Sequence, residues 1–184
     1  MIHSWSESGN VPPIDYSKVY LADIDAMFNT QVHIFAFPVV YKGGKSLIDK
    51  MANLFVKHKE KLDDKLIIFL SAGPPGTIER HIVDVLRRNN VNCSIATAFR
   101  NDWTVEEFLR KDKKRVLAGN HVKSLRKVEF FYDMLGIKYK TLSSIKEAEI
   151  YENARNGIQY ATTVFINQLA LAYQGTNIRA MTEY

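Results

Sequence analysis

The sequence predicts an α/β fold: a mostly parallel sheet with helices on both faces, followed by one long C-terminal helix. Short apolar runs alternate with helix-length amphipathic runs, which is the pattern of a parallel sheet covered by helices. The chain has 184 residues, of which 46% are hydrophobic and 24% charged, as in one globular domain with a substantial core. After Ser144 the helical residues continue for about 29 positions, roughly 43 Å of helix.

Strands are expected where short apolar runs end in turn residues, and helices where apolar residues recur every three or four positions. The expected strands cover residues 2–6, 19–21, 32–37, 66–71, 92–96, 115–118 and 138–141. The expected helices cover residues 24–28, 45–61, 77–88, 105–109, 121–135 and 145–173. Gly136 is expected to end the helix before it, because glycine readily takes the left-handed conformation found there. These elements form one α/β domain over residues 1–143.

Residues 144–184 are expected to form the long helix and a tail, packed on the same domain. Ser144 and Glu147 have the spacing of a capping box at the helix start. The apolar residues form two stripes: Ile145, Ala148, Ile158, Phe165, Leu169 and Ala172 on one side, and Ile150, Ala154, Gly157, Ala161, Val164 and Leu171 on the other. A helix that is apolar on two sides is buried on two sides, within its domain or against a second copy. We therefore expect a homodimer through the helix at 145–173.

Positive charge is concentrated in one segment of the chain. The formal net charge is +5, but residues 110–127 hold eight basic residues and one acid, Asp112. Six of the basic residues form a candidate polyanion patch: Lys111, Lys113, Lys114, Lys123, Arg126 and Lys127. Such a patch fits nucleotide phosphates, nucleic acid or an acidic partner. The same residues also fit a solvated loop and helix face, and both interpretations stay open.

Several other classes of protein are not indicated. No apolar run reaches the roughly 20 residues that cross a bilayer, and the first residues lack the basic and apolar regions of a signal peptide. The single cysteine, Cys93, cannot form an internal disulfide and is expected to be inert core, so we expect a cytoplasmic protein. The five histidines have no metal-ligand spacing, so no metal is expected.

The segment Phe69-Leu-Ser-Ala-Gly-Pro-Pro-Gly-Thr77 is the most informative part of the sequence. It has the composition of a buried strand, a Pro-Pro-Gly turn and the start of a helix. This arrangement predicts exposed backbone N–H groups at the carboxyl end of a parallel strand, where open α/β sheets bind ligands. A purely structural strand-to-helix turn would have the same composition.

This segment resembles the Ser-Thr-Val-Pro-Pro-Gly-Thr motif of the nucleotide-sugar dehydrogenases, which include UDP-glucose and UDP-N-acetylmannosamine dehydrogenases. Four further stretches match in the order in which that family places them: residues 22–28 with 32–38, 115–119, 121–135, and 148–156 with 165–170. The resemblance implies a trimmed Rossmann-like fold that dimerises through its long helix. It also implies ligand binding by Pro38, Ser71, Pro74, Pro75, Gly76, Thr77 and Asn156.

The departures from the family concern its reactive residues. The chain has no GxGxxG sequence, and Ala72 stands where the family has its functional threonine. Glu152 stands where the family has a lysine, which reverses the charge beside a developing oxyanion. The family's nucleophilic cysteine has no counterpart here, because Cys93 falls beside an expected strand. Of the residues around the reacting centre, only Asn156 is retained.

We therefore expect a protein that is non-catalytic on its own and that binds a nucleotide or nucleotide sugar, or scaffolds a partner. An alternative is one piece of a split NAD-dependent UDP-sugar dehydrogenase, in which NAD binds only together with a completing partner chain. A second alternative is a nucleic-acid or polyanion-binding module that uses the basic patch.

Overall fold

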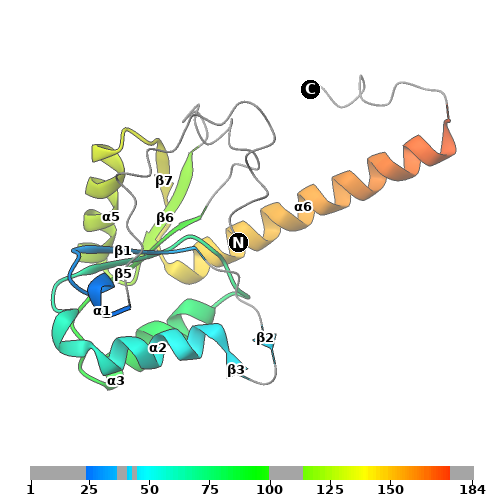
Figure 1. Ribbon diagram of the computed structural model, residues 1–184. Helices are drawn as coiled ribbons and strands as arrows, with labels where there is room; N and C mark the ends of the chain where they lie inside the picture. Colours follow the sequence, from blue (N-terminus) through cyan, green and yellow to red (C-terminus); the bar gives the residue numbers. More distant parts are fainter. Residues whose placement is uncertain (1–23, 37–40, 43–44, 100–113, 175–184) are drawn as a thin grey trace.

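The computed structural model describes residues 24–36, 41–42, 45–99 and 114–174. The expected strands at 2–6 and 19–21 and the expected helix at 105–109 lie outside the described residues. Within them, a five-stranded sheet carries helices on both faces, which confirms the predicted α/β fold (Figure 1). The strands of this sheet are β1 (Val32–Phe35), β4 (Leu66–Phe69), β5 (Ser94–Phe99), β6 (Arg115–Gly119) and β7 (Tyr139–Thr141).

The helices follow the predicted order with small shifts at their ends. They are α1 (Ile24–Met27), α2 (Leu47–Lys57), α3 (Asp84–Arg88), α5 (Val122–Met134) and α6 (Ile145–Ala172). A two-strand hairpin of β2 (Tyr41–Lys42) and β3 (Lys45–Ser46) replaces the expected start of α2, and a 3-10 turn at Lys59–Lys61 replaces its expected end. A π-helical turn, η3 (Glu79–Val83), leads into α3.

The sheet has the order β1-β4-β5-β6-β7 and is mostly parallel. Strand β4 pairs in parallel with both β1 and β5, β6 runs antiparallel to β5, and β7 runs parallel to β6. The predicted strand at 92–96 is shifted to Ser94–Phe99, because pairing with β4 begins at Ser94 and the small residues after Ile95 continue the buried strand. The carboxyl ends of β1, β4 and β5 therefore lie at one edge of the sheet.

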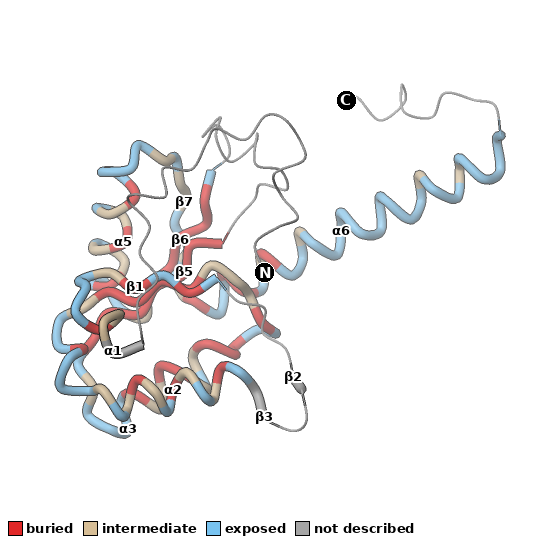
Figure 2. Tube along the Cα trace, in the orientation of Figure 1, coloured by how far each residue is buried: buried red, intermediate tan, exposed pale blue. Residues whose placement is uncertain are grey.

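Alternating residues of each strand divide between two hydrophobic cores, as the period of two in a β-strand requires. On one face the strands contribute Phe35, Ile67, Phe69, Ile95, Phe99, Val116 and Ala118, which pack against α2, η3, α3 and the start of α6. On the other face they contribute Leu66, Ile68, Ala96, Ala98 and Leu117, which pack against Val128 and Tyr132 of α5. Figure 2 shows both layers of buried residues centred on the sheet.

Helix α5 ends as predicted. Leu135 is its C-cap, and Gly136 follows with a left-handed φ of +63°, where its backbone N–H donates to Asp133 O at 3.0 Å. The chain then turns directly into β7.

Helix α6 begins at Ser144, whose side chain accepts a hydrogen bond from Glu147 N at 3.1 Å, as the capping box predicts. The Glu147 carboxylate accepts from Ser143 N at 2.9 Å, and hydrogen bonds from the Ser143 hydroxyl and from the Ser143 and Ser144 backbone lower its pKa. Only the first turns of α6 pack on the domain, and the rest projects away from it (Figures 1 and 2). The predicted packing of this helix on its own domain is thus correct only for its start.

Within the described residues, no helix has the length and apolar character that crossing a membrane requires.

Candidate functional site

The turn after β4 lies at the carboxyl edge of the sheet, where the sequence predicts a ligand site. Gly76 has a φ of +85°, which favours glycine at this position because it lacks a Cβ atom. The backbone N–H of Thr77 donates to Pro74 O at 3.0 Å, and its hydroxyl donates to the same oxygen at 2.5 Å. The Pro-Pro-Gly turn is thus closed on itself before η3 begins.

A carboxylate from α6 occupies the other amides of this turn. Glu149 is fully buried, and its two oxygens accept from Gly76 N at 2.6 Å and from Ile78 N at 3.1 Å. Burial raises the pKa of Glu149, while the two amide hydrogen bonds act in the opposite direction. A carboxylate at the start of a helix is the arrangement that the helix dipole favours.

The prediction of exposed backbone N–H groups at this turn is therefore wrong. The N–H groups of Gly76 and Ile78 are satisfied by Glu149, and that of Thr77 by Pro74 O. The sequence contains a signal for this contact, since Glu149 lies inside the matched stretch at 148–156. Its role was missed because Glu149 lies 73 residues after Gly76 and 71 residues after Ile78 in the chain.

Asn153 lies one helical turn after Glu149 in α6 and makes a second contact with the Pro-Pro-Gly turn. Its side-chain amide donates to Gly73 O at 2.8 Å and to Glu149 O at 2.8 Å. Gly73 is itself tightly placed, because a Cβ atom there would meet the Thr77 side chain at 3.0 Å. The start of α6 and the Pro-Pro-Gly turn therefore form one rigid unit.

Glu152, at the position of the family's lysine, is buried and paired within α6. Arg155 Nη2 lies 2.5 Å from Glu152 Oε1, and Arg155 Nε donates to Glu152 Oε2 at 3.2 Å. The side-chain amide of Asn156 donates to Glu152 Oε1 at 3.4 Å. The retained asparagine is thus engaged with a carboxylate, and a negative group at this place opposes the formation of an oxyanion.

The structure brings most of the predicted ligand residues together at one end of the sheet. Ser71 is half-buried, Gly76 and Thr77 are buried, and both prolines of the turn are exposed. Asn156 is exposed on α6, where its side chain contacts Glu152. Pro38 lies outside the described residues. Ala72 packs against the core, so no hydroxyl stands where the family has its threonine.

Acidic residues offset part of the positive charge that α5 contributes to the basic patch. Lys123 and Lys127 both pair with Asp64 Oδ1, at 2.6 and 2.8 Å, and these bonds lower the pKa of Asp64 to about 2. Arg126 pairs with Glu129 at 2.9 Å. Lys114 is exposed, whereas Lys111 and Lys113 lie outside the described residues. Polyanion binding by this segment remains a prediction.

Cys93 is buried just before β5, which confirms its predicted place in the core, and burial raises the pKa of its thiol to about 11. Among the described residues, no cluster of histidine, cysteine and carboxylate side chains could hold a metal ion.

Comparisons of the sequence find no matching family model and no matching curated protein. Solved structures with the same fold are found. GDP-mannose dehydrogenase from Pseudomonas aeruginosa superposes with a TM-score of 0.68 at 14% identity, over 86% of this chain and 39% of that chain. UDP-glucose dehydrogenase from Pyrobaculum islandicum gives a TM-score of 0.67 at 18% identity, over 80% of this chain and 36% of that chain. UDP-D-ManNAc dehydrogenase from Pyrococcus horikoshii gives a TM-score of 0.65 at 18% identity, over 89% of this chain and 41% of that chain.

The chain therefore has the Rossmann-like fold of the nucleotide-sugar dehydrogenases, which confirms the resemblance at the level of fold. It spans 36–41% of the length of these three enzymes.

Proposed function

We propose that this protein is a nucleotide-sugar-dehydrogenase-like assembly module, which is non-catalytic on its own and associates with a second copy through α6. The observation that carries this proposal is the projecting part of α6. This part of α6 has an uncharged, apolar and exposed surface. An isolated helix with such a surface is not stable in water and needs a packing partner. A cytoplasmic location, in which Cys93 stays a thiol, is part of the same proposal.

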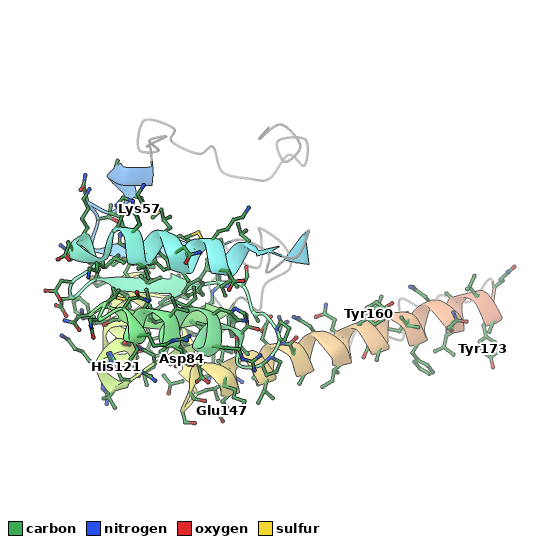
Figure 3. The ribbon with its side chains drawn as sticks, turned by 90° about the horizontal axis from the view of Figure 1, so that it is seen from below. Lys57, Asp84, His121, Glu147, Tyr160 and Tyr173 are labelled. Atoms are coloured by element: carbon green, nitrogen blue, oxygen red, sulfur yellow. The ribbon has the colours of Figure 1, made fainter. Side chains whose placement is uncertain are left out.

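The sequence of α6 contains no charged residue from Gly157 to Ala172. Large side chains in this stretch are exposed, with exposed fractions of 70% for Ile158, 63% for Phe165 and 65% for Leu171. Figure 3 shows Glu147 beside the domain, and Tyr160 and Tyr173 on the part of α6 that extends beyond it. Contiguous exposed apolar surface of this kind marks a protein interface.

The apolar stripe of α6 faces away from the side on which the helix packs against its own domain. A rotation of about 100° per residue places Ile158, Ala161 and Phe165 together on the outer side, opposite the buried face that includes Ala148. The predicted division into two stripes, which put Ile158 and Phe165 on the side of Ala148, is therefore wrong. The side that begins with the buried Ala148 and Glu152 continues mainly with polar residues: Gln159, Thr163 and Asn167. A second α6 can cover the outer stripe without disturbing the domain, and a two-fold dimer buries the same stripe on both copies.

Support for assembly over nucleotide binding comes from the turn after β4. Its amides, which would otherwise attract a phosphate, are already bonded to Glu149 and to Pro74 O. The buried carboxylate of Glu152 adds negative charge near the same turn, although Arg155 offsets it. Both features disfavour an anionic ligand there.

Cysteine scanning tests the α6 interface. Single cysteines at Ala154, Gly157 and Ala161 are expected to give a disulfide-linked dimer at one or more positions under mild oxidation, where two Cα atoms approach within about 7 Å. Cysteines at Gln159 and Thr163, on the opposite side of the same helix, serve as matched controls and should form no disulfide-linked dimer. The native Cys93 does not interfere, because it is buried with a raised pKa. Equal cross-linking on both sides would contradict the proposed interface.

The purified protein is expected to produce no NADH from NAD with UDP-glucose or UDP-N-acetylmannosamine. The reason is that Ala72 and Glu152 replace the family's threonine and lysine, and that the sequence lacks GxGxxG. Absorbance at the NADH band, over pH values from about 6 to 9, is the measurement, with a complete UDP-glucose dehydrogenase as positive control. Steady turnover by the protein alone would overturn the non-catalytic assignment. Turnover only after a second chain is added would favour the split enzyme.

A further inference from the structure

A cluster of aromatic and basic side chains holds α1 against the domain. Phe28, immediately after α1, is fully buried. Its ring stacks on the His58 ring at 4.4 Å between centroids, and meets the edge of the His33 ring at 5.8 Å and 70°. The Phe28 ring is therefore in contact with an imidazole from β1 and with a second one from the segment after α2.

The backbone carbonyls at the end of α1 are bound by side chains. Met27 O lies 3.1 Å from His33 Nε2 and accepts a hydrogen bond from Thr30 Oγ1 at 2.9 Å. Phe28 O accepts from the ammonium group of Lys65. A helix of four residues has little stability of its own, so these contacts determine whether α1 stays in place.

His33 is the group in this cluster that protonation would disturb most. Its side chain is 2% exposed, and because a carbonyl only accepts hydrogen bonds, Nε2 carries the proton of the neutral ring. Nδ1 is buried and has no hydrogen-bond partner among the described residues. A second proton, on Nδ1, would create a buried positive charge, which hydrogen bonding of the ring to the backbone of Met27 and Thr30 offsets only in part.

The charged and titratable groups that the described residues bring to this cluster offer no compensation. They are Lys65, from the turn before β4, and His58, on the other side of the Phe28 ring. Burial lowers the pKa of His33, and the positive charge of Lys65 lowers it further. Hydrogen bonds of the ring to the backbone of Met27 and Thr30 act in the opposite direction, but burial outweighs them.

We propose that this cluster is an acid-sensitive latch, in which protonation of His33 releases α1 from the domain. The closed state keeps His33 neutral, whereas an open state exposes the ring and lets it take a proton near its ordinary pKa of 6.5. Closing is therefore fully favoured above pH 6.5 and becomes less favoured as the pH falls below it. The open fraction should rise about tenfold for each pH unit below that value until the closed form is protonated too.

Hydrogen exchange of the full chain, corrected for the intrinsic rate at each pH, tests the latch. Protection of the amides in residues 24–31 is expected to fall about tenfold between pH 7.5 and 5.5. Protection of β5 should not change, because that strand is in the centre of the sheet. In His33→Gln the side-chain amide can still donate to Met27 O but does not titrate, so the loss of protection should disappear. His121→Asn, which replaces an exposed histidine at the start of α5 by another capping residue, should behave as the unmodified protein.

Two results would overturn the latch. One is an equal loss of protection in β5, which would indicate acid unfolding of the whole domain. The other is the same pH response in His33→Gln as in the unmodified protein. If His33→Gln does not fold, the ring of His33 can be titrated directly by nuclear magnetic resonance. It should stay neutral at pH 6.5, and half-protonation at that pH would contradict the proposal.

Discussion

Ile158→Glu is expected to convert the protein from a dimer to a monomer. Full burial of an isoleucine side chain contributes about 1.5–3 kcal/mol, and in a two-fold dimer the residue is buried twice. The substitution also places a charge in an apolar contact, which opposes association further. We expect the dimer to be weakened by at least about 3 kcal/mol, which is more than a hundred-fold in the dissociation constant. Sedimentation velocity measures this change directly.

Gln159→Glu is the matched control, because it introduces the same charge one residue further along the same helix. Gln159 lies on the side of α6 that continues the packing face, away from the proposed interface. The dimer of the Gln159→Glu variant should have the same dissociation constant as the dimer of the unmodified protein. If both variants weaken association equally, the effect comes from adding charge to α6, and the outer stripe is not the interface.

Glu149→Ala is expected to destabilise the domain by about 3 kcal/mol, because it leaves the buried N–H groups of Gly76 and Ile78 without an acceptor. For a chain of this size, that corresponds to a fall in the melting temperature of roughly 6–12 °C. The start of α6 should also loosen, since Asn153 would be the main remaining tie to the turn. Thermal unfolding followed by circular dichroism gives the melting temperature.

The control for this prediction is Glu147→Ala, two residues earlier in the same helix. The Glu147 carboxylate is exposed, and its hydrogen bonds go to the neighbouring Ser143 and Ser144. Its removal should change the melting temperature much less than the removal of Glu149. Similar melting temperatures for the two variants would mean that the contact between α6 and the turn does not stabilise the fold.

The fold could be predicted from the sequence because its signals are local. The run at β4 is apolar on both faces, as a strand between two covering layers must be. Gly136 predicted the end of α5 to within one residue and Ser144 the start of α6, because capping depends on the backbone of a few neighbouring residues. The shifts at β5 and α2 occur where pairing with a distant strand, or a short hairpin, decides the boundary.

The errors in the candidate site concern contacts between segments far apart in the chain. The amides of the Pro-Pro-Gly turn were expected to be exposed, because nothing within the turn shows that Glu149 reaches it. Lys123 and Lys127 were expected to be free, because their partner Asp64 lies about sixty residues earlier. The apolar pattern of α6 did not show which side of the helix the domain covers.

The molar mass of the unmodified protein in solution tests the central claim most directly. Sedimentation equilibrium over a wide range of protein concentration should give a reversible monomer–dimer equilibrium that approaches twice the chain mass of 21.1 kDa. Ile158→Glu should remain at 21.1 kDa over the same range. A mass of 21.1 kDa for the unmodified protein at every concentration would contradict assembly through α6.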